Sequence, residues 1–326
     1  MKFLPLLLIL GLVCLSPSAM ADSLYLGEAQ NFNAVIFGDL TAENADTEGR
    51  LAVGGNASIP SSYSVGHSVI GPQNPQSNGT RNDLVVKGDV TLPAGYVTVN
   101  FGNVQVGGSV SGTGVFSQLA PNASYSNVSN FENDIFNFTA VESMVRSYSS
   151  YWSTLSSSGS VTDLEYELQL SGSNPMLNVF NVTADEWATN GARYIDVPEG
   201  ATTLINISGE MVTTVGGTVV FGTTPDTLKN PDDYRNNVIY NLYDATSIQS
   251  DYLLWEGSVF APDATLTTTG GAINGQAFLG DVYQQEYFEF HNFGLEAEYI
   301  VIPEPRFYIP MIGLLTFCAI VFRRKR

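Results

Sequence analysis

Two histidines are the side chains of this sequence best suited to acid–base or metal chemistry. His67 lies in the stretch SVGHSVIG, where no cysteine or neighbouring carboxylate is present to pair with it, and His291 lies in the aromatic stretch EFHNF. Zinc takes three or four protein ligands, so a site built on both histidines needs acids from distant parts of the chain. We expect His291 to be a hydrogen-bonded structural residue. We assign no catalytic or cofactor-binding residue and no set of metal ligands.

Motifs of common enzymes are absent from the sequence. It contains no G-x-S-x-G, no P-loop and no H-E-x-x-H. Adjacent carboxylates such as Asp232 and Asp233 are frequent in so acidic a chain, and we expect this pair to lie in a solvated loop over residues 223–237. The sequence therefore indicates a protein that is not an enzyme, with a glycan-active enzyme as the lowest alternative.

Acidic residues dominate the charged side chains. The 326-residue chain has 13 Lys and Arg against 32 Asp and Glu, a formal net charge of −19. Residues 22–302 hold seven Lys and Arg against 31 Asp and Glu, so this part alone carries −24. Such a surface repels the phosphate backbone, which excludes nucleic acid as a partner. We predict no cofactor. Calcium, which binds hard oxygen ligands, stays open as an alternative to a purely solubilising charge, although no D-x-D-x-D-G loop is present.

Cysteine is confined to the two ends of the chain. Cys14 lies in the first apolar run and Cys318 in the last, and residues 22–302 contain none. Disulfides, thiol catalysis and cysteine-ligated metals are therefore not available to the region between the ends.

Residues 1–21 have the pattern of a signal peptide. Lys2 is followed by an apolar stretch and then by Ala19-Met20-Ala21, and small residues at Ala19 and Ala21 suit a signal peptidase site. We expect signal peptidase to act on the chain and the mature protein to begin at Asp22, so that residues 22–302 form an exported domain.

Residues 303–326 have three parts in order. These are the motif Pro303, Glu304 and Pro305, an apolar segment over 307–322, and the basic end Arg323, Arg324, Lys325 and Arg326. The apolar segment predicts a transmembrane helix, and the basic end predicts a cytoplasmic stop. The order resembles the PEP-CTERM sorting signal, which implies processing by an exosortase-type enzyme in Gram-negative bacteria that often make exopolysaccharide. The chain is then a membrane-anchored precursor, transiently in the inner membrane, and afterwards a cell-surface or extracellular protein. An uncleaved membrane anchor is the alternative.

The elements between the two ends are short strands punctuated by glycine. Gly38, Gly55, Gly88 and Gly108 recur along the first part of the domain, and Gly257 and Gly275 recur in the same way near its end. Intervals of roughly 20 residues suit one coil of a parallel β-solenoid, with glycine at the corners. The longer interval between Gly55 and Gly88 contains a polar insertion over 68–83. We predict a mainly β, parallel solenoid-like domain, with a β-sandwich as the alternative.

One segment has the periodicity of a helix. Its apolar residues from 130 to 155 recur at spacings of three and four, which predicts one amphipathic helix against the flank of the solenoid. Ser129 or Asn130 is the expected cap. The stripe consists of Phe131, Ile135, Phe138, Val141, Val145, Tyr148, Trp152 and Leu155.

Threonine-rich strands suggest a binding face. Residues 265–269 and the pair Thr213-Thr214 would supply a flat threonine ladder for ice or carbohydrate, although threonine is also an ordinary strand residue.

The opening and closing blocks of the domain carry a family resemblance. The segment FNAVIFGD at 32–39, followed by EGRLAVGGN at 48–56, resembles the opening of choice-of-anchor A domains. The closing blocks GSVFAPDA at 257–264 and EFHNF at 289–293 are also similar to that family. The resemblance implies a surface or matrix role, because family members carry alternative attachment signals and some relatives are collagen-binding adhesins. The closing pattern is also similar to ice-binding β-solenoids with a flanking helix.

Together these features predict a non-enzymatic protein of the cell surface or biofilm matrix, with an adhesive or structural role. Extracellular matrix or exopolysaccharide is the expected partner. An ice- or carbohydrate-binding solenoid is the first alternative.

Overall fold

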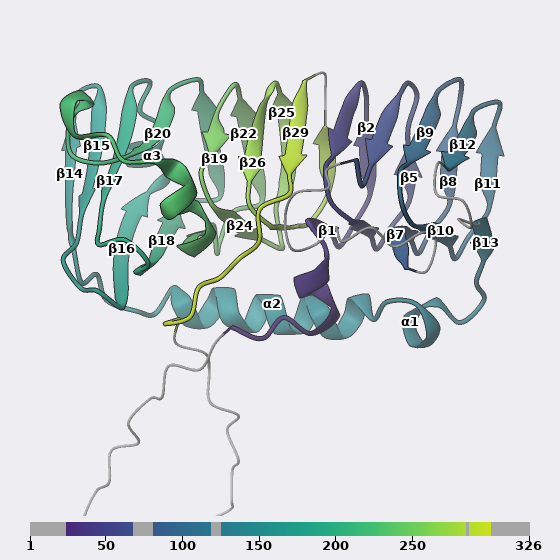
Figure 1. Ribbon diagram of the computed structural model, residues 1–326, viewed down its shortest axis with the longest axis horizontal. Coiled ribbons are helices and arrows are strands. Elements are labelled where there is room, and N and C mark those ends of the chain that lie inside the picture. Colours follow the sequence, from purple (N-terminus) through teal and green to yellow (C-terminus); the bar gives the residue numbers. More distant parts are fainter. Residues whose placement is uncertain (1–23, 68–80, 119–124, 285–286, 301–326) are drawn as a thin grey trace, which may run out of the picture.

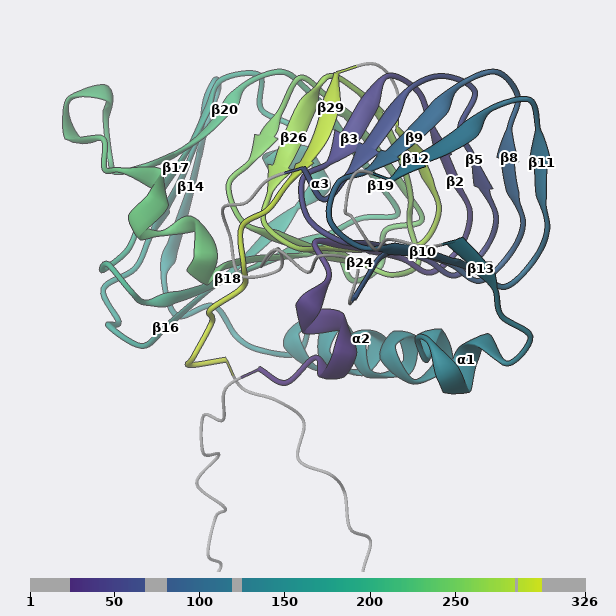
Figure 2. The ribbon, with the colours of Figure 1, turned by 45° about the vertical axis from the view of Figure 1, so that its right-hand side comes forward.

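The domain is a parallel β-solenoid flanked by a helix. The computed structural model describes residues 24–67, 81–118, 125–284 and 287–300. Seven coils each contribute one strand to each of three sheets (Figures 1 and 2). Nearly all neighbouring strands pair in parallel, which confirms the solenoid and excludes the β-sandwich.

The ten-stranded sheet, sheet A, faces the helix. Its strands in spatial order are β13 (Tyr125–Asn127), β10 (Asn103–Val106), β7 (Asn82–Val86), β4 (Leu51–Val53), β1 (Ala34–Ile36), β27 (Ala277–Leu279), β24 (Ser258–Ala261), β21 (Val238–Asn241), β18 (Thr202–Ser208) and β16 (Leu177–Thr183).

Two further sheets form the other sides of the coil. Sheet B is β11 (Val110–Gly112), β8 (Val90–Leu92), β5 (Ala57–Ser58), β2 (Leu40–Ala42), β28 (Val282–Gln284), β25 (Thr265–Thr269), β22 (Ser247–Asp251) and β19 (Met211–Val215). Sheet C is β12 (Val115–Gln118), β9 (Tyr96–Val99), β6 (Tyr63–Val65), β3 (Ala45–Thr47), β29 (Phe288–His291), β26 (Gly271–Asn274) and β23 (Leu254–Trp255).

A four-stranded sheet, sheet D, lies at one end of the solenoid. It contains β14 (Ser160–Leu164), β15 (Glu167–Ser171), β17 (Ala192–Asp196) and β20 (Thr218–Phe221). Strands β14 and β15 pair in antiparallel fashion and form a hairpin. Short helices complete the chain: η1 (Gly27–Asn31), α1 (Phe131–Asp134), α3 (Ala184–Trp187), η2 (Pro225–Thr227), η3 (Pro231–Asp233) and η4 (Arg235–Asn237).

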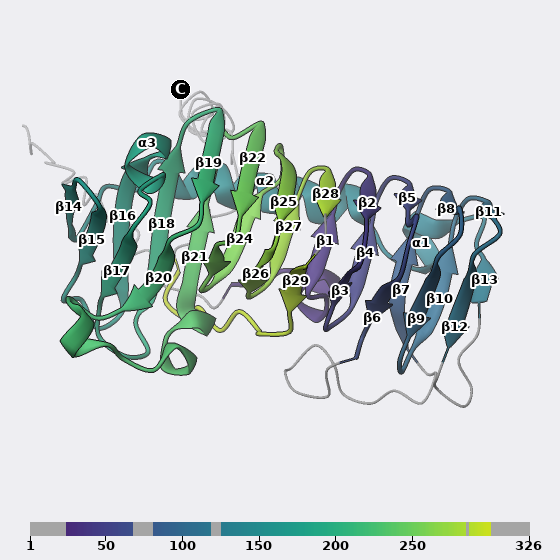
Figure 3. The same cartoon turned by 90° about the horizontal axis from the view of Figure 1, so that it is seen from above.

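The first and last coils of the chain lie side by side in the middle of the molecule. β1 pairs with β27, β2 with β28 and β3 with β29, although the partners come from opposite ends of the domain sequence. The chain builds one half outward from this seam, returns along helix α2 (Phe138–Trp152), and builds the other half inward (Figure 3). Residues far apart in sequence are therefore neighbours across the seam.

A ladder of corner residues fixes the register between coils. The Asp39 carboxylate accepts a hydrogen bond from the Asn56 backbone at 2.6 Å, the Asn56 side chain accepts one from Asp89, and the Asp89 carboxylate accepts one from Ser109. Each ladder residue follows a glycine, and a Cβ on Gly38 would lie 2.1 Å from the Asp281 carboxylate. The glycine spacing predicted from the sequence therefore marks real corners, where no side chain fits beside the ladder.

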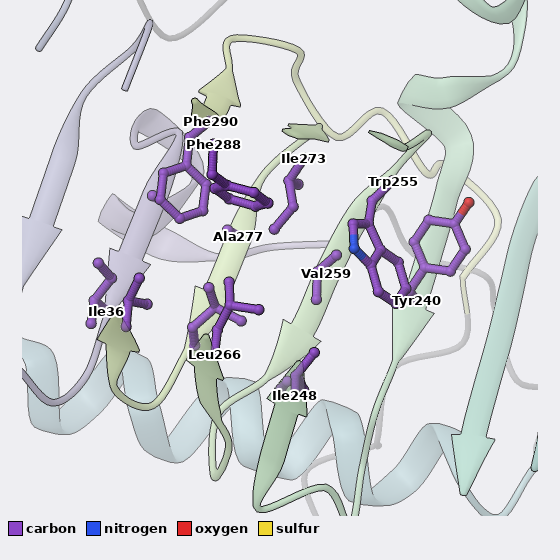
Figure 4. Close-up of a cluster of buried hydrophobic side chains, with 14 of the residues drawn as sticks. Ile36, Tyr240, Ile248, Trp255, Val259, Leu266, Ile273, Ala277, Phe288 and Phe290 are labelled. Carbon is purple, nitrogen blue, oxygen red and sulfur yellow. The ribbon is translucent and has the colours of Figure 1, made fainter. Parts of the chain in front are cut away.

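The interior of the coil is filled with aliphatic and aromatic side chains. Figure 4 shows Trp255, Tyr240, Phe288 and Phe290 among smaller residues such as Ile36, all less than 2% exposed. A second apolar cluster lies between sheet A and the helices. Sheet A is thus buried on both faces, which explains its uninterrupted apolar runs such as AVI in β1.

The predicted helix exists but is divided. Helix α1 ends at Asp134 and α2 begins at Phe138, where the side chain of Asn137, and not that of Ser129 or Asn130, accepts the capping hydrogen bond from Ala140. The break allows Phe136 to pack against Phe32 and Phe138. The single helix over 130–155 was therefore wrong in its continuity, because the aromatic contacts and the cap compete with helical backbone bonds. In the part of the chain that the structure describes, no helix has the length and apolarity needed to cross a membrane.

Candidate functional site

An open, shallow pocket lies on the outer face of sheet C, beside the seam. Its volume is about 410 Å³. Four neighbouring strands, β29, β3, β6 and β9, present one polar side chain each to it. In register these are Glu289, Asp46, Ser64 and Thr98. We call this cavity the sheet C groove.

Two tyrosines flank the groove. Tyr96 precedes Thr98 by two residues within β9, so its ring stands on the outer side of the sheet, and Tyr287 lies directly before β29. Both also line the pocket, and Tyr96 is 52% and Tyr287 75% exposed. Three strand spacings separate their strands, or roughly 14 Å. The groove therefore has polar groups along its length and an aromatic ring at each end.

Asp46 is the most perturbed acid in the groove. Its pKa is raised to about 6, first by burial and then by the neighbouring carboxylate of Glu289, whereas His67 acts in the opposite direction. Asp46 Oδ1 is buried and has no hydrogen-bond partner among the residues that the structure describes. An unpaired buried acceptor is costly, and the cost is greatest when the carboxyl group is ionised, which is consistent with the raised pKa of Asp46.

His291 links the groove to a buried ion pair. The Asn274 side-chain amide donates to Glu256 at 2.9 Å, so its oxygen is left to accept from His291 Nδ1 at 2.5 Å. Glu256 lies 3.1 Å from Arg235, and burial raises the pKa of Glu256. The other ring nitrogen, His291 Nε2, lies 2.7 Å from the Glu289 carboxylate, so the imidazole contacts both Asn274 and Glu289. This network holds Glu289 in place.

His67 lies on the same side of the groove as Glu48. Its Nε2 is 3.9 Å from the Glu48 carboxylate, and its Nδ1 is 3.3 Å from Ser64 Oγ. The expectation that no carboxylate pairs with His67 was wrong, because Glu48 comes from the preceding coil and stacks beside it. Despite the proximity of both histidines to acids, no group of three His, Cys, Asp or Glu side chains among the described residues is arranged to hold a metal ion.

The predicted threonine face lies on sheet B. Thr265, Thr267 and Thr269 point outward, whereas Thr268 and Thr214 are buried inside the coil. The outward row at the middle of the sheet runs through eight strands in register: Thr213, Gln249, Thr267, Tyr283, Thr41, Ser58, Thr91 and Ser111. Hydroxyl side chains form most of it, but Tyr283 stands 49% exposed in its centre.

The remaining predicted residues lie apart from these surfaces. Asp232 and Asp233 are in the short helix η3 within the loop over 223–237, and Asp232 is 3.3 Å from Arg235. The signal peptidase site, both cysteines, the Pro303-Glu304-Pro305 motif and the basic end lie outside the described residues.

Sequence reasoning missed the acids of the groove. Asp46 and Glu289 belong to two coils at opposite ends of the domain sequence, and they meet only because β29 pairs with β3. The sequence did contain one signal for this pairing. The first block of the domain, which ends in ADTEGR, and the last block, which ends in EFHNF, have similar internal spacing. Without the knowledge that the last coil stacks on the first, that spacing has no meaning.

Comparison with family models now places the chain. Residues 25–292 match the model described as "Putative Ice-binding-like adhesive domain". The chain belongs to this family. The ice-binding-like adhesive domain thus covers all four sheets and the groove. A search of curated proteins found no match.

Solved structures with similarity to this ice-binding-like adhesive domain are ice-binding proteins. One is from the Antarctic ascomycete Antarctomyces psychrotrophicus, with 12% identity, a TM-score of 0.34, and coverage of 82% of this chain and 98% of that one. Another is from an Antarctic biological consortium, with 14% identity, a TM-score of 0.34, and coverage of 85% and 95%. A third, from an Antarctic bacterium of the Flavobacteriaceae, has 12% identity, a TM-score of 0.31 and coverage of 79% of both chains.

Proposed function

We propose that this ice-binding-like adhesive domain is a non-enzymatic adhesin that binds a neutral saccharide in the sheet C groove. The observation that carries the proposal is the groove itself. It holds a register-aligned row of Glu289, Asp46, Ser64 and Thr98 between two exposed tyrosine rings.

The chemistry of the groove suits a sugar. A saccharide offers hydroxyl donors to the carboxyl groups of Asp46 and Glu289, and it accepts hydrogen bonds from Ser64 and Thr98. Its apolar C–H faces pack against aromatic rings such as those of Tyr96 and Tyr287. Among the described lining residues there is no Lys or Arg, so an anionic polymer would be repelled. These properties favour a neutral glycan.

The setting of this adhesin is the cell exterior. Residues 1–21 and 303–326 support export, signal peptidase cleavage and exosortase-type processing, and the charge of −24 over residues 22–302 supports solubility there. In this proposal the domain is held at the surface or in the extracellular matrix, and its glycan is part of an exopolysaccharide. The choice-of-anchor A and PEP-CTERM resemblances are consistent with this setting.

A glycan array tests the groove. The full chain in detergent is applied to neutral, amino and acidic glycans, beside the variants Tyr96→Ala, Tyr287→Ala and Asp46→Asn. Tyr166→Ala is the matched control, because Tyr166 is equally accessible at 65% exposure but lies at the β14–β15 hairpin. We expect neutral glycans to be retained by the wild type and the control and to be lost by the groove variants.

Two outcomes contradict the proposal. Equal retention by wild type and groove variants would place binding elsewhere, and release of reducing ends from a retained glycan would show an enzyme. The reducing-end assay is included because two carboxyl groups, of which one has a raised pKa, are also what a glycoside hydrolase uses.

Ice is the second candidate ligand, favoured by the hydroxyl row of sheet B. Thr267, Thr41, Ser58 and Thr91 repeat at one strand spacing on a rigid surface. The large Tyr283 side chain interrupts the flat surface that such a ligand needs. Thermal hysteresis of the wild type, and its increase in Tyr283→Thr, would support ice binding. Its absence in both at high protein concentration would remove this candidate.

A further inference from the structure

Exposed tyrosines recur along the corner at which sheet B turns into sheet C. In Figure 1 the turns of this corner form the edge of the solenoid that lies farthest from helix α2. The strand register places one residue of each coil in a row along this edge, and we call the row the B–C ridge. In spatial order it consists of Tyr252, Gly270, Tyr287, Asn44, Ser62, Tyr96 and Val115.

Three tyrosine rings stand on the B–C ridge. Tyr252 is 65% exposed, Tyr287 75% and Tyr96 52%. Two strand spacings separate Tyr252 from Tyr287 and three separate Tyr287 from Tyr96, so the rings extend over about 24 Å along the axis of the solenoid. None of the residues of the row is charged. The sheet C groove is lined by Tyr287 and Tyr96 but not by Tyr252, so the ridge continues beyond the groove.

Two of these tyrosines occupy backbone positions that favour glycine. The φ angles of Tyr252 and Tyr287 are 57° and 66°, in the left-handed region, where Gly270 between them also has 66°. A bulky side chain rarely adopts this conformation, because its Cβ comes too close to the backbone. Since both rings are largely exposed, packing does not account for the strain, and strain of this kind is typical of positions with a binding role.

The stretch between Tyr252 and Tyr287 is an apolar extension of the groove. The Tyr252 ring lies over Gly270, because a Cβ on that glycine would be 2.8 Å from ring atoms Cδ1 and Cε1. The ring therefore leans along the ridge in the direction of Tyr287. Leu254, two residues after Tyr252, is 43% exposed on the same outer face. This end of the ridge thus presents apolar surface, whereas the groove presents carboxyl and hydroxyl groups.

We propose that the B–C ridge binds one linear, neutral polysaccharide along the axis of the solenoid, with Tyr252 as a subsite beyond the sheet C groove. The inference rests on the proposed function and specifies that its ligand is a polymer. A ridge is convex and does not enclose a small molecule as a concave pocket does. A chain of sugars reaches all three rings at once, so that each further contact is intramolecular and raises the affinity. The apolar faces of the sugars pack against the rings, and the domain charge of −24 repels an anionic chain.

Binding of sugar chains of graded length tests the ridge. The full chain in detergent is titrated with fragments, from single sugars to octasaccharides, of β-glucan, glucomannan, galactan and dextran, and of the neutral glycan that the array retains most strongly. Tyr252→Asn removes the ring, and Asn44, with a φ of 47°, shows that asparagine fits this corner. Tyr252→Phe keeps the ring and removes its hydroxyl. Tyr166→Asn is the matched control, because Tyr166 is also 65% exposed but lies at the β14–β15 hairpin.

We expect the affinity of the wild type to rise with fragment length until the sugar chain spans the three rings. Tyr252→Asn should weaken the binding of the longest fragments about fivefold or more and leave the binding of short fragments, which fit between Tyr287 and Tyr96, unchanged. Tyr252→Phe and Tyr166→Asn should bind fragments of every length as the wild type does. The thermal unfolding midpoints should be similar in all these proteins, because the replaced side chains are exposed.

The ridge is overturned as a polymer site by any of three results. The wild-type affinity does not increase with fragment length, Tyr252→Asn binds the longest fragments as tightly as the wild type, or this variant loses affinity equally for short and long fragments. If Tyr287→Ala still loses binding in such a case, the proposed function stands without the ridge. If the wild type binds no fragment of any length, both proposals are wrong.

Discussion

On sheets A and C, the outward-facing residues at the middle of the strands form rows with the same geometry. The helix covers only the row of sheet A. On sheet A the row passes from Val85 through Ala52, Val35, Phe278 and Phe260 to Asn241, Asn206 and Asn181, and the helix covers it. On sheet C the equivalent row contains Thr98, Ser64, Asp46 and Glu289, which line the groove. Helix α2 runs along the opposite side of the solenoid from this sheet (Figure 2). One coil therefore supplies both surfaces. The side chain that it turns outward decides whether a surface packs against the helix or lines a polar groove.

The largest expected effect is a loss of stability on the sheet A side. Trp152 is fully buried at the end of α2, with its ring 5.0 Å from that of Phe260. Trp152→Ala should lower the free energy of unfolding by about 3–5 kcal/mol, because it leaves a cavity between the helix and the sheet. Chemical denaturation measures the change, and Ser150→Ala on the exposed side of the helix is the control. A loss under about 1 kcal/mol would mean that the helix does not stabilise the sheet.

The asparagine part of the same row should have an intermediate effect. The Asn241 amide donates to the Ser149 carbonyl at 2.9 Å and to Asn206 at 2.8 Å, and its oxygen accepts from Ser149 Oγ at 2.6 Å. Asn241→Ala leaves several buried polar atoms unpaired and should cost about 1–3 kcal/mol. Asn181→Ala, at the exposed end of the asparagine row, should cost less in the same denaturation experiment. Equal losses of unfolding free energy in the two variants would show that burial of the asparagine row is unimportant.

The smallest expected effect is on the sheet C side and depends on pH. Asp46 has a folded-state pKa of about 6 against an ordinary value of 3.8, so the folded protein binds its proton more tightly than the unfolded chain does. The stability from this proton is complete below about pH 4 and is lost as the pH rises through 6. The groups facing Asp46 are Glu289, Glu48, His67 and His291.

Asp46→Asn removes this dependence. The variant should be more stable than the wild type at pH 7.5 by about 1 kcal/mol, once solvent screening at this half-buried position is allowed for, and the difference should shrink by pH 5. Thermal unfolding of both proteins at the two pH values measures it. A difference that grows toward pH 5 would have the wrong sign.

The repeating coils could be predicted from the sequence, but the seam between the first and last coils could not. The glycine spacings predicted the corners, because each coil must turn where Gly38, Gly55 and Gly88 allow the ladder to pass. The groove depends on the pairing of β29 with β3, which come from opposite ends of the domain sequence. Local spacing has no information on which coils stack, so Asp46 and Glu289 could not be brought together in advance.

The sequence also did not show which residues of each strand point outward. Thr267 and Thr268 are adjacent and similar in sequence, yet Thr268 is buried inside the coil and Thr267 faces solvent. A strand reverses face at every residue, so a run of three threonines predicts a strand without saying which of them a ligand can reach.

A crystal structure of the full chain with the glycan retained on the array tests the sheet C groove most directly. We predict electron density for a sugar between Tyr96 and Tyr287, with a hydroxyl donating to Asp46. A sugar bound along the hydroxyl row of sheet B, with the sheet C groove empty, would contradict the assignment of the groove.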